Sequence, residues 1–329
     1  MDSRRMIAVI VLVPVLVSLA LWAFAWPAAR TAPHDLPLGV AGPPTAVAQV
    51  EQRLTQREGA FEIHRYADED AARDAVEDRT VYGAVIAGDR GPKLLTASAA
   101  GPAVAQLLQQ AVTGQASASG TPVQVVDVVP APEADPRGAA FGASVLPLAL
   151  AGIATGTVTT LLGLRGARAV AALVGAAGLT GLVAAAIAHS WLGVVTGDWW
   201  AVAGVFGLST LAVGAGIAGL GALLGRAGLG LGGAVMMLLG NPFSGASSAP
   251  EMLPQPAGAI GQWLPPGAGA SLLRSVSFFD GAAAAGPALT LTWWAVLGLG
   301  AVLLGGALRQ RARGDSPAPD RAPAPAAAA

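Results

Sequence analysis

Charged residues are scarce in this chain of 329 residues, and several reactive side-chain types are rarer still. Only 12% of the residues are charged, about half the fraction usual in soluble domains, whereas 53% are hydrophobic. There is no cysteine, which excludes a disulfide framework and thiolate chemistry. The composition therefore predicts a protein that is solvated largely by lipid.

Signatures of catalysis and nucleotide binding are also missing. No P-loop pattern occurs, and the one lysine, Lys93, does not follow a glycine-rich turn, so the chain carries no ATPase of that type. His34, His64 and His189 stand far apart and lack metal-ligand spacing. The acidic run at residues 68–70 lacks the glycine turn and spaced oxygens of a cation site, and we interpret it as a helix start. We expect no enzyme activity, cofactor or metal.

Six apolar stretches without charged residues predict transmembrane helices. They are residues 6–26, 141–164, 169–192, 199–224, 227–247 and 289–308. The first has 21 residues, about 31 Å as a helix, which matches the hydrocarbon thickness. Asn241 and Pro242 interrupt the fifth stretch. A cleaved signal peptide stays open as an alternative for the first stretch, because small residues flank Phe24, but the length of the run favours a retained anchor.

Arginines and tryptophans segregate to opposite ends of these predicted spans. With the N-terminus inside, nine arginines fall in the cytoplasm, and the short outer loops outside the inserted domain keep only Arg274, as the positive-inside rule requires. The inner set is Arg4, Arg5, Arg165, Arg168, Arg226, Arg309, Arg311, Arg313 and Arg321, and the tryptophans at outer ends are Trp22, Trp26, Trp191, Trp199, Trp200, Trp293 and Trp294. We therefore expect a bacterial cell-membrane protein with a cytoplasmic N-terminus (residues 1–5) and a disordered cytoplasmic tail (residues 309–329).

Residues 27–140 have the pattern of a water-soluble domain, inserted between the first two spans on the outer side. Fourteen of the 20 acidic residues lie between Arg30 and Arg137. The hydrophobic periods predict the element order β-α-β-α-β-β-α-β, a compact α/β domain. Residues 114–120 are interpreted as a flexible linker and residues 130–136 as a stiff tether. The mild acidity of this domain argues against nucleic acid as a partner.

Glycines recur four residues apart in the predicted bundle of residues 141–308. The pairs are Gly152 with Gly156, Gly221 with Gly225, and Gly228 with Gly232. Such pairs let helix backbones approach closely in lipid, so we predict tight packing within the bundle or in a dimer.

A lid segment, residues 241–288, separates the last two predicted spans. Several prolines break it into short pieces, which we interpret as amphipathic helices at the outer interface or dipping into it as a re-entrant element. We expect Trp263 at headgroup depth and Arg274 facing water or an acidic headgroup. The candidate gate residues are Asn241, Pro242, Ser244, Trp263, Pro265 and Arg274. The alternative is a loop that only connects two spans.

The predicted order is one span, an outer α/β domain and five further spans. Three motifs precede the last span, namely Asn241-Pro-Phe-Ser-Gly, Leu253-Pro and Leu264-Pro-Pro. This order resembles the membrane subunits of ATP-binding-cassette type-2 exporters, and among them the actinobacterial relatives of phage-infection-protein (Pip) type. The resemblance implies a homo- or heterodimer, a separate cytoplasmic ATPase, a hydrophobic or amphipathic substrate and an outer lid before the last span.

Two functions follow from these patterns. The first is a permease-like subunit of a bacterial exporter, which the resemblance favours. The second is a non-transporting scaffold or receptor that presents its outer domain to a secretion or cell-envelope partner. The second stays open because only residues 1–5 precede the first predicted span and the inner turn at residues 164–168 is short, which leaves little surface to hold an ATPase.

Overall fold

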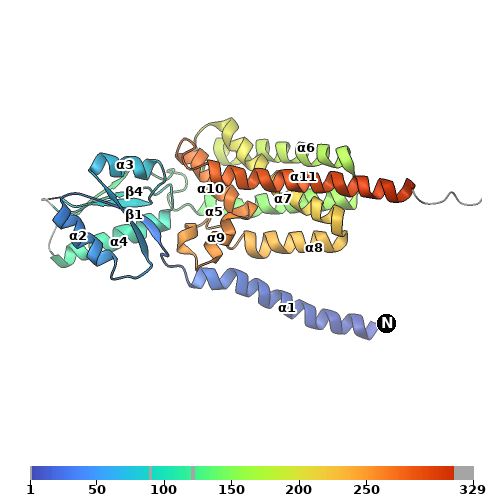
Figure 1. Ribbon diagram of the computed structural model, residues 1–329, viewed down its shortest axis with the longest axis horizontal. Coiled ribbons are helices and arrows are strands. Elements are labelled where there is room, and N and C mark those ends of the chain that lie inside the picture. The colour runs from blue at the N-terminus through green and yellow to red at the C-terminus, as the bar shows by residue number, and fades with distance from the viewer. Residues whose placement is uncertain (1, 89–90, 120–122, 315–329) are drawn as a thin grey trace, which may run out of the picture.

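The computed structural model of the protein describes residues 2–88, 91–119 and 123–314 and has two parts (Figure 1). A helical bundle occupies one end, and a five-stranded sheet with its covering helices occupies the other. The chain begins with α1 (Asp2–Ala29), forms the sheet region from residues 36–127, and enters the bundle at α5 (Ala139–Leu161). The sheet region therefore lies between the first and second long helices in sequence.

The sheet region has the strand order β2-β1-β3-β4-β5. Its strands are β1 (Leu36–Ala41), β2 (Phe61–Tyr66), β3 (Gly83–Ile86), β4 (Lys93–Thr96) and β5 (Gln124–Asp127), and its helices are α2 (Pro44–Leu54), α3 (Glu69–Glu77) and α4 (Pro102–Ser119). β1 pairs in parallel with β2 and β3, whereas β4 runs antiparallel to β3 and parallel to β5. The element order along the chain is the predicted β-α-β-α-β-β-α-β.

The alternation of side chains along the strands builds a core on each face of the sheet. In β4, Leu94 packs with residues of α4 such as Leu108, while Leu95 packs with Ala72 of α3 on the other face. The helix start predicted at the acidic run is confirmed, because the Asp68 side chain accepts a hydrogen bond of 2.9 Å from the Ala71 N–H.

One segment of the sheet region differs from its prediction. Residues 114–119, interpreted as a flexible linker, form the last turns of α4, and Gly120 lies outside the described residues. The glycine and serines there alternate with alanine and glutamine, which are good helix formers. Residues 130–136 join β5 to α5 without regular helix or strand.

The bundle is built around α7 (Trp199–Leu224). Its other helices are α6 (Gly166–Ala185), with a π-helical turn η1 (Ala186–Trp191), α8 (Arg226–Val235), with a second π-helical turn η2 (Met236–Gly240), and α11 (Ala285–Gly314). α5, α6 and α11 all pack against α7. A methyl group added at Gly152 would lie 2.6 Å from Cβ of Val213 on α7, so the predicted close approach of helix backbones is present. Gly225 is instead the turn between α7 and α8, with φ of +66°.

Five helices of the described chain are long and apolar enough to cross a membrane: Ile10–Ala29, Ala139–Leu161, Gly166–Trp191, Trp199–Leu224 and Ala285–Arg311. The sequence predicted six. The predicted fifth span is a shorter apolar helix, Arg226–Gly240, formed by α8 and η2 with 10 and 5 residues. That length gives about 22 Å, less than the hydrocarbon thickness of about 30 Å.

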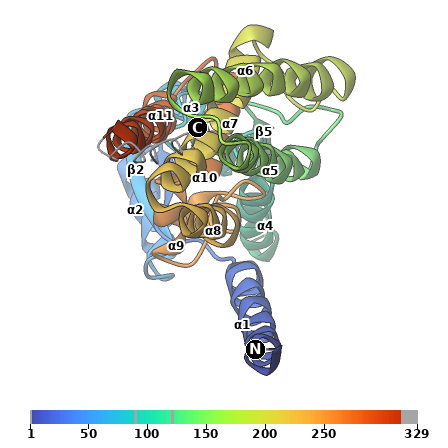
Figure 2. The ribbon, with the colours of Figure 1, turned by 90° about the vertical axis from the view of Figure 1, so that its right-hand side faces the viewer.

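Both chain ends of the described bundle lie away from the sheet region. The start of α1 and the end of α11 are at the far end of the long axis (Figure 1). α11 continues to Gly314, so residues 309–314 are helical and not part of a disordered tail, and residues 315–329 lie outside the described residues. α1 stands apart from the other helices (Figure 2) and meets the bundle near Trp26, whose ring lies 6.4 Å from that of Phe243.

Candidate functional site: the junction of lid segment, bundle and sheet

The lid segment begins after η2 and contains η3 (Pro250–Met252), α9 (Ala257–Gln262) and α10 (Pro265–Phe278). These helices lie between the bundle and the sheet region (Figure 1). α10 packs against α7, α11 and α5, and most of its residues are buried. An interfacial amphipathic helix, as predicted for this piece, would expose one face; α10 is instead enclosed by the chain.

Arg274 is the clearest departure from prediction. We expected its guanidinium to face water or a lipid headgroup, but only 3% of the residue is exposed. Its Nη2 donates a hydrogen bond of 3.0 Å to the Ala246 carbonyl oxygen, and the guanidinium lies 4.7 Å from the ring centroid of Phe141. A backbone carbonyl and an aromatic face thus take the place of solvent.

The other candidate gate residues lie at the start and in the middle of the lid segment. Asn241 ends η2, and its carbonyl accepts a hydrogen bond of 2.7 Å from the Ser244 hydroxyl. Pro242 is partly buried and Pro265 is the buried first residue of α10. The Trp263 side chain is 74% exposed, while its carbonyl accepts a hydrogen bond of 2.9 Å from Nε1 of Trp294 on α11. The structure therefore ties Asn241 to Ser244 but does not gather all six residues at one point.

A line of hydrogen bonds joins the lid segment to the sheet region. Gln262 Nε2 donates to the Ser244 carbonyl at 3.0 Å, and the Ser271 hydroxyl donates to Gln262 Oε1 at 2.6 Å. From the sheet region, Nη1 of Arg79 donates to the Ser271 carbonyl at 3.1 Å and to the Ser275 hydroxyl. Arg79 follows α3 and has φ of +59°, a backbone conformation that costs energy outside glycine and that aims its side chain at α10.

A second contact bridges the same two parts. The Tyr82 hydroxyl donates a hydrogen bond of 2.7 Å to Oε2 of Glu251 in η3. Burial raises the pKa of the Tyr82 phenol far above its usual range, and the negative charge of Glu251 adds to this shift. Burial also lowers the pKa of the Arg79 guanidinium, which stays protonated at neutral pH. We name Arg79, Tyr82, Glu251, Gln262 and Ser271 the junction cluster.

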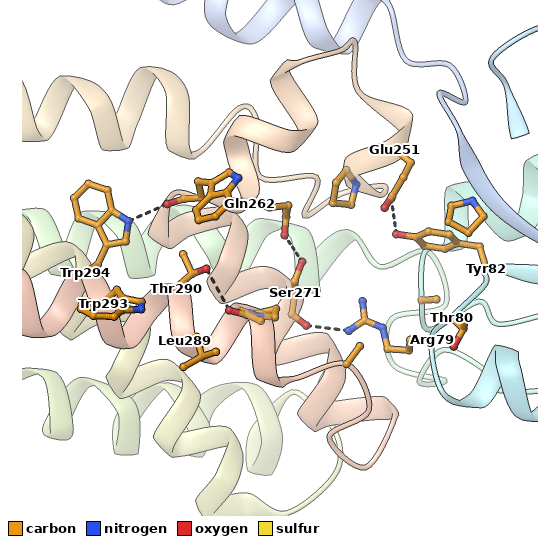
Figure 3. A pocket seen from close by; sticks show the side chains of 17 residues that line it. Arg79, Thr80, Tyr82, Glu251, Gln262, Ser271, Leu289, Thr290, Trp293 and Trp294 are labelled. Atoms are coloured by element: carbon orange, nitrogen blue, oxygen red, sulfur yellow. Dashed lines mark hydrogen bonds between the residues drawn. The ribbon is translucent and has the colours of Figure 1, made fainter. Parts of the chain in front are cut away.

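The junction cluster borders a cavity of about 740 Å³ (Figure 3). Residues of the sheet region, the lid segment and the first turns of α11 line it, so it opens where all three meet. Figure 3 shows Arg79 pointing toward Ser271 and Tyr82 pointing toward Glu251 at one end, with Trp293 and Trp294 at the other. The cavity therefore has a polar end and an aromatic, apolar end. Its size is typical of small-molecule sites.

Sequence reasoning singled out the lid segment but named none of the five residues of the junction cluster. Arg79 and Tyr82 follow a helix and precede a strand, where polar residues are ordinary. Glu251 carried a signal, because it is one of three acidic residues between positions 138 and 308, with Asp198 and Asp280. An acidic residue in so apolar a stretch needs a buried partner, but nothing local in the sequence names Tyr82 as that partner.

The comparison with protein families decides the affiliation of the chain. Residues 4–308 match the model described as ABC-2 family transporter protein. The chain belongs to this family. Neither the curated proteins nor the solved structures gave a match. The relation to Pip-type proteins is not tested by this match and stays a prediction.

Membership of the ABC-2 family agrees with the architecture. Members are membrane subunits of transporters and generally work with a cytoplasmic ATPase, and the family is not one of catalytic enzymes. Together with the five long apolar helices, the match makes this chain a multi-pass membrane protein of a transporter family.

Proposed function

We propose that this chain is the permease-like subunit of a bacterial exporter, driven by a separate cytoplasmic ATPase. The observation that carries this proposal is the family match, which extends over nearly all of both the sheet region and the bundle. The ABC-2 description places the chain with transporters, and the cavity at the junction supplies a place where a small or amphipathic molecule fits.

In this proposal both chain ends lie in the cytoplasm and the sheet region lies outside the cell membrane. The arginines outside the sheet region support it, with nine in the predicted inner segments against one in the short outer loops, as does the clustering of Arg165 and Arg309 at the bundle end opposite the sheet. α8 and η2 would make a short sixth crossing, completed by the first residues of the lid segment. A dimer would form in the membrane, on surfaces of the bundle that a single chain leaves exposed.

The lid segment would act as the outer gate between closed and outward-open states. Two features support this role. The segment contacts α7, α11 and the sheet region, which are the parts that would have to move, and the hydrogen bonds from Arg79 to Ser271 and from Tyr82 to Glu251 join it to the sheet region. Opening would exchange these hydrogen bonds for water or for groups of a substrate.

Affinity purification from native membranes tests the exporter proposal. The tagged full-length chain would be solubilised in mild detergent, and proteins retained with it would be identified by mass spectrometry. We expect a nucleotide-binding subunit to be retained and its ATP hydrolysis to change when the chain is bound. An ATPase that is never retained, together with unchanged efflux after deletion of the gene, would overturn the proposal.

One observation favours the scaffold as the second candidate. At the end away from the sheet, only residues 162–165 join α5 to α6 and only Gly225 joins α7 to α8, so the described helices present short turns there. A scaffold needs no surface for an ATPase. Retention of secretion or cell-envelope proteins by the tagged full-length chain, in place of an ATPase, would support the scaffold function.

A further inference from the structure

Arg79 has hydrogen-bonding capacity that the described chain does not use. A guanidinium carries five N–H donors, yet both acceptors of Arg79, the Ser271 carbonyl and the Ser275 hydroxyl, are reached through Nη1 alone. Nε and Nη2 have no acceptor among the described residues. Since Arg79 lines the cavity, these remaining donors are available to a ligand there.

The charges around this end of the cavity are not balanced. Arg79 and Glu251 are the charged residues among those described that line the cavity, and Arg274 lies close enough to interact electrostatically with both. In the described part of the chain neither arginine has a carboxylate within 4.0 Å, and Glu251 already accepts the Tyr82 hydroxyl. Two cations therefore lie near one anion, and this excess of positive charge at the partly buried Arg79 favours an anionic group.

The opposite end of the cavity offers no comparable polar group. Leu289, Trp293 and Trp263 line it, and they are 61%, 61% and 74% exposed. Tryptophan side chains with one face open suit contact with an acyl chain at the level of the membrane interface. Figure 3 shows Trp293 at the end of the cavity away from Arg79, with Leu289 and Thr290 between them.

We infer that the cavity binds a single-chain anionic amphiphile, with its anionic head on the free N–H groups of Arg79 and its chain along Trp293 and Trp263. The cavity volume of about 740 Å³ suits one chain and a compact head. The inference builds on the proposed function, because it names the substrate class that the outer gate would hold. Binding itself needs no ATPase, so it is measurable separately.

Native mass spectrometry of the purified full-length chain in an uncharged detergent tests this inference. Lysophosphatidylglycerol, which is anionic, would be titrated against lysophosphatidylcholine, which has no net charge. We expect one tightly bound lysophosphatidylglycerol and an affinity for lysophosphatidylcholine about tenfold weaker or less. Equal binding of the two lipids would overturn the charge argument, and no bound lipid at all would overturn the site.

Two variants with matched controls locate the binding site. Arg79→Gln should weaken lysophosphatidylglycerol binding about tenfold, whereas Arg57→Gln, at an exposed arginine of the same region, should leave it unchanged. Because Arg79 also holds α10, a second variant avoids this contact. Gly286 lines the cavity and a Cβ there meets open space, so Gly286→Phe should fill the cavity, and Gly300→Phe, at an equally open glycine of α11, should not.

If Gly286→Phe leaves lysophosphatidylglycerol binding unchanged, the lipid binds elsewhere and the inference is wrong. If that variant weakens the binding of both lipids equally, and neither is preferred, the cavity binds lipid through apolar contacts alone. That result would refute the role of Arg79. A chain that binds lysophosphatidylglycerol as expected but never retains an ATPase would contradict only the exporter proposal.

Discussion

Tyr82 is partly buried and Arg274 is buried at the junction of sheet region and lid segment, and each donates a hydrogen bond to a residue distant in the sequence. Tyr82 donates to Glu251, and Arg274 donates to the Ala246 carbonyl. A buried polar group that loses its partner costs more than the hydrogen bond contributed, because nothing replaces the water it gave up. Single substitutions here therefore have measurable effects.

Alkaline titration tests the environment of Tyr82. The chain has two tyrosines, so a Tyr66→Phe variant reports on Tyr82 alone. Burial and Glu251 raise the pKa of Tyr82, and we expect its phenolate absorbance to be missing at about pH 11, where free tyrosine is ionised. Since the pKa is raised on folding, this stabilisation is complete below about pH 10 and is lost as the pH rises above it. Phenolate that forms near pH 10 while the chain is folded would contradict the placement of Tyr82.

The buried arginine is predicted not to tolerate lysine. Arg274→Lys keeps the charge but loses the planar group that both donates to the Ala246 carbonyl and stacks on Phe141. We expect destabilisation of about 1–3 kcal/mol, measured as a lower thermal midpoint in detergent. Arg57→Lys, at an exposed position, is the control and should change little. Equal midpoints for the two variants would show that the Arg274 contacts contribute nothing to stability.

At the scale of elements, the bundle depends on helices that approach closely at glycines. Gly152 of α5 faces Val213 of α7, whereas Gly175 of α6 has open space where a Cβ would stand. Gly152→Val should force α5 and α7 apart and cost about 1–3 kcal/mol, while Gly175→Val should be nearly neutral. Thermal unfolding of the two variants in the same detergent makes the comparison. If Gly175→Val is the more damaging, the packing of α5 on α7 is not as described.

Regular elements of this chain could be predicted because their signals are local. The short apolar run of β1 and the acidic start of α3 depend only on neighbouring residues, and both elements are where the sequence predicted them. The shortened fifth span also had a local signal in Asn241. The lid segment could not be predicted in this way, because α10 takes its partners from Gln262, the sheet region and the bundle. A helix with serines and an arginine looks interfacial until those partners are known.

For the candidate site, the sequence drew attention to the lid segment, but it identified none of the five residues of the junction cluster. Arg79 comes to Ser271 across 192 positions, and Tyr82 to Glu251 across 169. No spacing rule connects residues at such separations. Only the fold, which places the end of α3 over α10, makes them neighbours.

At the scale of the whole molecule, the absence of cysteine makes the proposed orientation directly testable. Gln56→Cys places a thiol on the exposed surface of the sheet region, and Ala167→Cys places one on the exposed first turn of α6. In intact cells, a membrane-impermeant maleimide should label position 56 and reach position 167 only after permeabilisation. The reverse pattern would invert the topology, and with it the proposed outer gate.

The unequal burial of the long helices has a consequence for how the sequence can vary. In the most apolar stretch of α7, 78% of the residues are buried within the chain, against 11% in α1. α7 should accept few substitutions, whereas α1 should accept almost any apolar residue. The residues of α1 could therefore change in evolution while its hydropathy is kept. A saturation scan that found α1 as intolerant as α7 would reveal that a neighbouring protein covers it in the membrane, and the intolerant positions would trace the outline of that neighbour.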